Sequence, residues 1–78
     1  MKELLEFIAK NLVTNPNEVS VTEVPTDSER SIILELRVAK EDMGKVIGKQ
    51  GKIAKAIRMV VKAAAVKENK RVSVEIVQ

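Results

Sequence analysis

The sequence predicts an α+β fold in which helices cover one face of a three-stranded sheet. Two segments, residues 2–14 and 51–66, carry apolar side chains at helical spacing, and three shorter segments alternate apolar and polar residues as half-buried strands do. The 78 residues suit one domain, 1–78, and an apolar fraction of 45% is sufficient for a packed core. We expect Phe7 to be the one aromatic side chain of that core.

The first half of the chain predicts one helix followed by a hairpin of two strands. The helix covers residues 2–14 and ends at Asn15-Pro16-Asn17, because proline disfavours helical geometry in the residue before it. Residues 19–24 form the first strand, with Val19 and Val21 on one face, and the turn Pro25-Thr26-Asp27-Ser28 follows. The second strand has an apolar face made of Ile32, Leu34, Leu36 and Val38.

The second half predicts two helices around a glycine turn and then a third strand. A short helix covers about residues 40–46, with Glu41 and Asp42 in its first turn, where the helix dipole favours negative charge. A longer helix covers about residues 51–66, and Asn69 is its expected left-handed cap. Residues 72–76 alternate as a strand. The expected order is therefore α-β-β-α-α-β.

Composition excludes several classes of function. The chain has no cysteine and no histidine, which removes thiol chemistry, the commonest general base and the commonest transition-metal ligand. Glu41 and Asp42 are adjacent on a helix start, so helix capping explains them better than catalysis. We expect no enzyme activity, no cofactor, no metal site and no small-molecule substrate. The N-terminal run does not resemble a signal peptide and no apolar run is long enough for a membrane span, so a cytoplasmic location without membrane binding is expected.

Charge is distributed unevenly along the chain. Residues 1–39 hold four Lys/Arg and seven Asp/Glu, a net charge of −3, whereas residues 40–78 hold ten and four, a net charge of +6. No acidic residue occurs from Met43 to Val66, where six basic ones do: Lys45, Lys49, Lys52, Lys55, Arg58 and Lys62. This pattern fits a polyanion partner and a solvated lysine-rich face about equally well.

The most informative motif is the turn Gly48-Lys49-Gln50-Gly51 between the two helices. Glycine tolerates positive φ and lets another backbone come close, and the second glycine opens a helix whose free N–H groups attract phosphate. Two glycines in a tight turn need no ligand, but Lys49, Lys52 and Lys45 around them favour a phosphate site. A Walker A loop does not fit, since Lys52 is followed by Ile53.

The long helix is apolar around more of its surface than one sheet contact requires. Ile53, Ile57, Val60 and Ala64 share the face expected in the core, and Lys55, Arg58 and Lys62 share a basic edge. The remaining apolar residues fit either a deeply buried helix or a second buried surface against a protein partner. The candidate interface residues are Ala56, Met59, Val60, Ala63 and Val66.

The segment Val46-Ile47-Gly48-Lys49-Gln50-Gly51-Lys52-Ile53 resembles the [I/V]-I-G-x-x-G-x-x-I signature of KH domains, and the expected element order is that of their type II arrangement. The chain as a whole resembles the KhpA family of small bacterial single-KH RNA-binding proteins, from Lys2–Lys10 through Leu34–Val38 to the run Glu41–Arg58 and Val60–Ala65. The resemblance implies binding of single-stranded RNA with little sequence selectivity and a role as RNA chaperone in post-transcriptional regulation. It also implies self-association or pairing with a KhpB-like (Jag) KH protein, and a link to cell elongation and division.

Carried over from the family, the turn Gly48–Gly51 would clamp the RNA backbone. Val46, Ile47 and Ile53 would form the floor of the groove, although Val46 and Ile47 fit the core equally well. Its charge would come from Lys45, Lys52, Lys55 and Arg58. The competing hypothesis is an interaction or scaffold protein in which RNA binding is incidental.

Overall fold

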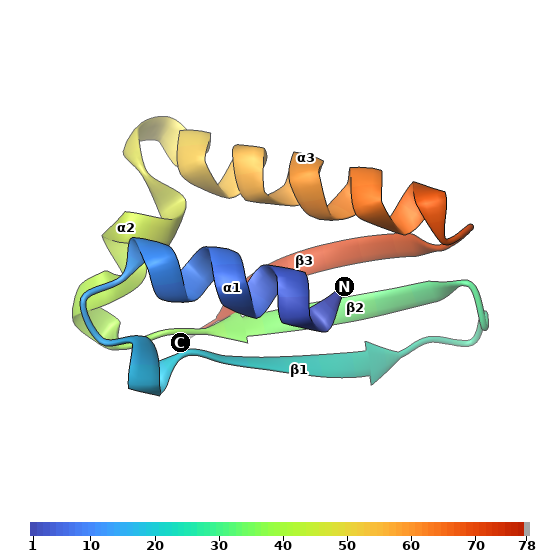
Figure 1. The fold of residues 1–78 in the computed structure, drawn as a ribbon, viewed down its shortest axis with the longest axis horizontal. Helices are drawn as coiled ribbons and strands as arrows, with labels where there is room; N and C mark the ends of the chain where they lie inside the picture. Colours follow the sequence, from blue (N-terminus) through green and yellow to red (C-terminus); the bar gives the residue numbers. More distant parts are fainter. Residues whose placement is uncertain (78) are drawn as a thin grey trace.

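The computed structural model, which describes residues 1–77, has two layers: a three-stranded sheet and helices on one of its faces (Figure 1). Its elements are α1 (Lys2–Leu12), β1 (Ser20–Pro25), β2 (Ser31–Arg37), α2 (Met43–Ile47), α3 (Lys52–Lys67) and β3 (Arg71–Val77). Single 3-10 turns occupy Pro16–Glu18, Lys40–Asp42 and Lys49–Gly51. The predicted α+β fold and its α-β-β-α-α-β order are confirmed.

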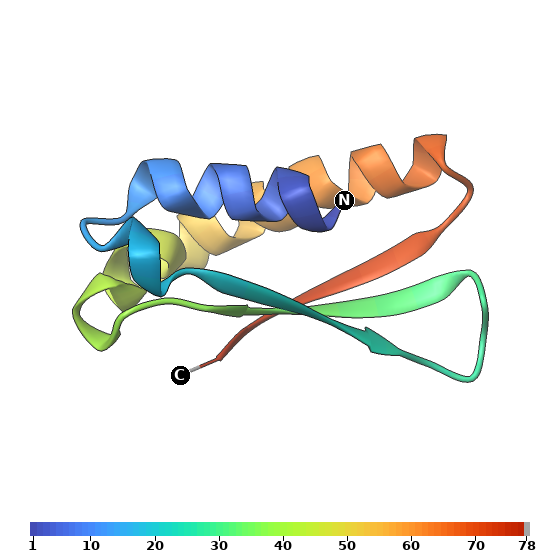
Figure 2. The same ribbon diagram turned by 60° about the horizontal axis from the view of Figure 1, so that its bottom comes forward.

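The sheet has the order β1-β2-β3, with β2 in the centre. β1 and β2 are antiparallel, with Ser20 opposite Arg37, which confirms the predicted hairpin. β2 and β3 are parallel, with Ser31 opposite Arg71. A parallel pair needs a long crossover, and α2 and α3 supply it. Figure 2 shows both long helices above one face of the sheet and no helix below the other.

The core lies between the helices and the inner face of the sheet. Leu5 and Ala9 of α1 are buried, and so are Val21 of β1 and alternate residues of β2 and β3, as the alternation predicts. Val46 of α2 is also fully buried. The core members are Leu5, Ala9, Val19, Val21, Leu34, Leu36, Val38, Val46, Ile57, Val61, Ala65, Val72 and Val74.

Two expectations about the core are wrong. Val60 is 49% exposed, while Val61 is fully buried, so α3 turns a different stripe toward the sheet, made of Ala54, Ile57, Val61 and Ala65. The helix is apolar on several sides, and tertiary packing therefore decides which side faces the sheet. Phe7 is 67% exposed and lies outside the core, because Leu5 and Ala9 occupy the buried face of α1.

Element boundaries differ from the expected ones by a few residues. α1 ends at Leu12, two residues before the predicted end, and residues 40–42 form a 3-10 turn ahead of α2. Asn69 has a φ of 58°, which confirms the left-handed cap predicted after α3.

Candidate nucleic-acid interface

The turn between α2 and α3 is built almost entirely from residues with positive φ. Gly48 has a φ of 73°, Gln50 of 56° and Gly51 of 75°. Gln50 therefore adopts a left-handed conformation that is uncommon outside glycine, asparagine and aspartate. Two backbone hydrogen bonds close the turn, from Gly48 N–H to Gly44 O at 2.9 Å and from Gly51 N–H to Gly48 O at 3.2 Å. The tight, glycine-dependent turn expected from the sequence is thus present.

The two glycines are required for different reasons. A Cβ added to Gly48 would lie 2.6 Å from Cγ1 of Ile53, well inside van der Waals contact, and its φ would also be strained. A Cβ added to Gly51 would meet nothing within 4 Å, so only its φ favours glycine. Gly48 therefore fixes the close packing of the turn on α3, whereas Gly51 permits the reversal that begins α3.

The outer surface of the turn is open and cationic. Lys49, Gln50 and Lys52 are exposed, and Gly48 and Gly51 are partly exposed. No side chain caps the N-terminus of α3, whose N-cap residue is Gly51. The N–H groups of a first helical turn carry partial positive charge and have no intrahelical partner. The turn thus presents main-chain donors beside two lysines, an arrangement suited to a phosphate group.

The expected apolar floor of the groove is only partly at the surface. Val46 is fully buried, so its side chain packs in the core and does not line a surface. Ile47 is 37% exposed and is the apolar residue of α2 that solvent reaches beside the turn. Ile53 is partly buried and packs against Gly48 and the core. Val46 therefore lies in the core, whereas Ile47 lies at the surface, where it remains available to the groove.

Two of the expected basic contacts are held by other parts of the protein. The Lys45 ammonium contacts Asp42 Oδ1 at 3.4 Å and hydrogen-bonds Thr14 Oγ1. Arg58 Nε donates to the carbonyl oxygen of Val74 in β3 at 3.2 Å. Lys49, Lys52 and Lys55 make no such contact with the part of the chain that is described. These three lysines are therefore the cations whose charge is unpaired near the turn.

Asp42 anchors this region through a role that the sequence did not reveal. Its carboxylate is fully buried and accepts hydrogen bonds from Thr14 N–H at 3.1 Å and from Asn15 N–H at 2.9 Å. The Asn15 side-chain amide adds a third at 3.1 Å. The expected helix cap is wrong, since Asp42 occupies the N-cap position of α2 but makes no capping hydrogen bond. Its carboxylate instead ties the segment after α1 to the start of α2.

The same contacts govern the ionisation of Asp42. Burial of the carboxylate raises the pKa of Asp42, but the N–H donors of Thr14 and Asn15, together with the Lys45 ammonium, lower it by more. The pKa therefore lies below its ordinary value and the group is charged at neutral pH. The charge of the carboxylate is satisfied by its hydrogen-bond donors. The sequence signal that could have revealed it is that Asp42 is the last acidic residue before the acid-free segment Met43–Val66.

The candidate interface residues of α3 are all exposed: Ala56, Met59, Val60, Ala63 and Val66. They recur three or four residues apart along α3 and therefore share one exposed side of that helix. Ala56 and Val60 line an apolar groove between α1 and α3, of about 470 Å³, together with Leu4, Phe7, Ile8, Leu12, Lys52, Ile53 and Ile57. Met59 and Val66 line two shallow hollows that also contain basic side chains of α3. Phe7 of α1 belongs to the groove between α1 and α3.

Two classes of site find no support within the described residues. Residues 1–77 contain no cluster of three or more acidic side chains that could hold a metal ion. Across that same range, no helix has the length and apolar character needed to cross a membrane.

Curated proteins from several bacteria resemble this chain over nearly its whole length. The RNA-binding protein KhpA of Clostridium acetobutylicum is 74% identical over 77 residues, covering 99% of this chain and 100% of that protein. The proteins of the same name from Clostridium perfringens and Borreliella burgdorferi are 70% and 50% identical, over 99% and 95% of this chain and 100% and 88% of theirs. No solved structure matches the chain. A model of the KhpA/KhpB KH domain matches residues 2–76, and the chain therefore belongs to the KhpA/KhpB KH-domain family.

Proposed function

We propose that this protein binds single-stranded RNA by holding the sugar–phosphate backbone on the turn Gly48–Gly51. One observation carries the proposal: a strained, glycine-dependent turn leaves the N-terminus of α3 without a side-chain cap and places exposed lysines beside it. The relatives named RNA-binding protein KhpA support RNA as the polyanion. In this proposal the protein binds RNA and does not catalyse a reaction. We place the protein in the cytoplasm.

Binding of this kind has low sequence selectivity. The chain has no tryptophan or tyrosine, and its one phenylalanine, Phe7, lines the groove between α1 and α3 and not the turn. Stacking of bases on aromatic rings is therefore not available at the turn, and affinity rests on phosphate contacts. Such affinity falls with salt, with a slope of about 0.7 per phosphate contact on a log–log plot for single strands.

The test replaces the two exposed residues of the turn with Asp, in the variant Lys49→Asp/Gln50→Asp. Aspartate tolerates the left-handed conformation of Gln50, so the fold should persist while two negative charges face the phosphate. We expect RNA affinity to fall by at least about tenfold with an unchanged melting temperature. The control Lys2→Asp/Lys10→Asp alters two exposed lysines of α1 and makes an even larger change of charge, yet its RNA affinity should fall much less. Equal losses in the two variants, or a flat salt response of the wild type, would contradict the proposal.

A second candidate function is self-association through the groove between α1 and α3. Phe7 is 67% exposed and Val60 49%, and one lysine, Lys52, stands among otherwise apolar lining residues. Such a surface favours an apolar partner, and a small domain gains stability by burying it. We propose a second copy of the chain as the occupant, because a two-fold interface can pair this groove with itself. A KhpB-like partner, and the link to cell elongation and division, belong to the same proposal.

Val60→Asp tests this second function separately from the first. A carboxylate at position 60 would have to be buried in the interface, so association measured by sedimentation should weaken by at least about tenfold. Lys49→Asp/Gln50→Asp should associate normally. A wild-type chain that remains monomeric at high concentration would exclude self-association, and capture of a KhpB-like protein by that monomer would make it the occupant.

A further inference from the structure

A second basic surface lies at the end of α3 opposite the glycine turn. Two turns meet there, the one between β1 and β2 and the one between α3 and β3, and they enclose a cleft of about 380 Å³. We call it the distal cleft, and its lining residues are Ser28, Arg30, Ser31, Asn69, Lys70 and Arg71. The N–H of Arg71 donates to the carbonyl of Arg30 at 2.7 Å and joins the two turns.

The cations of the distal cleft have no counterion within residues 1–77. Among residues 1–77, the side chains of Arg30, Lys70 and Arg71 form no ion pair and no hydrogen bond. No acidic residue lines the cleft, and its other members carry hydroxyl or amide groups. Three unpaired cations in an exposed hollow attract an anion from outside the chain.

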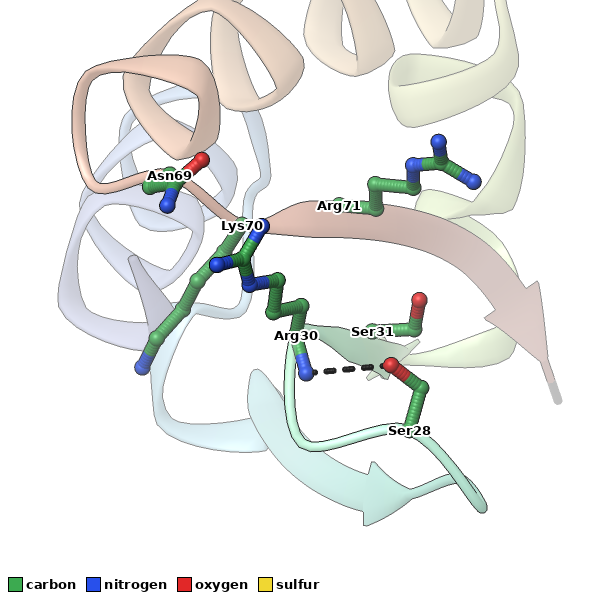
Figure 3. Close-up of a pocket in the computed structure, with 6 residues that line it drawn as sticks. All are labelled: Ser28, Arg30, Ser31, Asn69, Lys70 and Arg71. Carbon is green, nitrogen blue, oxygen red and sulfur yellow. Dashed lines mark hydrogen bonds between the residues drawn. The ribbon is translucent and has the colours of Figure 1, made fainter.

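The cations are spread out and do not converge on one point. Figure 3 shows the side chain of Arg30 extending from its own turn toward the backbone at Asn69 and Lys70, while Lys70 and Arg71 point to opposite sides of it. The N–H of Arg30 donates to Ser28 Oγ at 3.2 Å, which orders the turn that carries it. A small single anion could not contact all three groups at once, whereas an extended polyanion would meet them in succession.

A continuous series of hollows leads from the middle of α3 to the distal cleft. The first is lined by Lys55, Arg58, Met59 and Lys62. The second shares Lys62 with the first and also contains Arg71, which it shares with the distal cleft. The hydrogen bond from Arg58 Nε to Val74 O holds this side of α3 against β3. The basic edge of α3 and the free edge of β3 therefore form one path, and Figure 1 shows the two elements running side by side.

The path has a length that RNA can span. The 16 residues of α3 extend over about 24 Å at 1.5 Å per residue. At a phosphate spacing of about 3.4 Å in a stacked strand, this corresponds to roughly seven nucleotides, and to fewer in an extended strand. The glycine turn of a KH domain holds about four. An RNA longer than four nucleotides could thus reach the distal cleft while the turn holds its other part.

We propose that the distal cleft is a second phosphate-contact site for the same RNA strand, in which Arg30 and Lys70 hold the backbone several nucleotides away from the glycine turn. The inference rests on the proposed function, because the turn provides the first contact. The site acts on RNA length and not on sequence: it strengthens binding to long strands and leaves short ones unaffected.

The experiment compares a four-nucleotide and a twelve-nucleotide oligouridylate on the full chain. In Arg30→Glu/Lys70→Glu we expect affinity for the twelve-mer to fall by about tenfold, and affinity for the four-mer to change by less than about twofold. The neutral variant Arg30→Gln/Lys70→Gln should lower the salt slope for the twelve-mer by about 1.4, since two phosphate contacts are lost. Lys2→Glu/Lys10→Glu is a charge-matched change on α1, and it should alter the affinities for the four-mer and the twelve-mer by the same factor.

The outcomes separate this inference from the proposed function. Both proposals stand if Lys49→Asp/Gln50→Asp weakens binding of both RNA lengths while Arg30→Glu/Lys70→Glu weakens binding of the twelve-mer only. If Arg30→Glu/Lys70→Glu lowers the affinity for both RNA lengths equally, the effect is one of overall charge. If it lowers neither affinity, the cleft does not bind RNA. Each result overturns the second site alone. Binding of inorganic phosphate at the cleft without competition by the twelve-mer would assign it to a free anion and would also overturn the proposal.

Discussion

The two ends of α3 use the same backbone conformation for opposite purposes. Before the helix, Gly48, Gln50 and Gly51 have positive φ, and after it Asn69 does, at 58°. At the C-terminal end the freed polar groups find partners within the chain: Lys70 N–H donates to Ala65 O at 2.9 Å and Asn69 N–H to Val66 O at 3.0 Å. At the N-terminal end no side chain caps the helix. One reversal closes a helix with hydrogen bonds inside the chain, and the other leaves the helix N-terminus without a side-chain cap.

The residue types reflect this difference. Asparagine is adequate where a left-handed residue only has to end a helix, because nothing has to approach its backbone closely. Glycine is required where the turn packs against a neighbour, as Gly48 does against Ile53. The comparison predicts that the N-terminal turn is far more sensitive to substitution than the C-terminal one, and three changes test it.

The largest effect is expected for Gly48→Ala. The added methyl group overlaps Ile53 Cγ1, 2.6 Å away, and the backbone at position 48 has a φ of 73°. We expect a loss of about 3 kcal/mol in the free energy of unfolding, measured by denaturant titration, together with loss of RNA binding. Gly51→Ala is the matched control, since its Cβ meets open space, and only about 1 kcal/mol should be lost. Equal losses at the two glycines would show that packing against Ile53 is unimportant.

A smaller effect is expected for Asp42→Asn, which weakens the anchor of the N-terminal turn. The two carboxylate oxygens of Asp42 accept from the N–H groups of Thr14 and Asn15, but an asparagine side chain has only one oxygen that can accept. One N–H group would lose its partner, so the melting temperature at neutral pH should fall by roughly 10 °C. Because the folded-state pKa of Asp42 is lowered, its contribution is present above the unfolded-state pKa and is lost as pH falls through the folded-state value. The gap between wild type and variant should therefore close below about pH 4. A gap that is independent of pH would contradict the role given to the carboxylate.

The smallest effect is expected for Asn69→Gly at the C-terminal end of α3. Glycine accepts the φ of 58° at least as well, so the free energy of unfolding should change by less than about 0.5 kcal/mol. Affinity for a four-nucleotide RNA should be unchanged, since position 69 lies at the other end of the helix. Loss of binding to that short RNA would mean that the two ends of α3 are coupled and not independent.

Much of the fold follows from local sequence patterns. The alternation in residues 19–24, 32–38 and 72–76 identifies the strands and their buried faces, since side chains on a strand alternate strictly between two sides. Glycines at 48 and 51 identify the turn, because few other residues accept its conformation. The side of α3 that faces the sheet was predicted incorrectly, as Val60 shows. The apolar arc of α3 is much wider than one sheet contact, so its periodicity excludes the basic edge but does not select one stripe within the arc.

The sequence by itself determined the order of the elements, the position of the turn and the cations around it, because these depend on residues close together in the chain. The tertiary structure alone decided which of those cations are unpaired, since Lys45 is held by Asp42 and Thr14, residues brought to it by folding. It also decided that Phe7 faces a groove, and that Arg30 and Lys70, forty residues apart, share the cleft at the far end of α3. Contacts between distant segments depend on how the layers pack, and no local pattern records them.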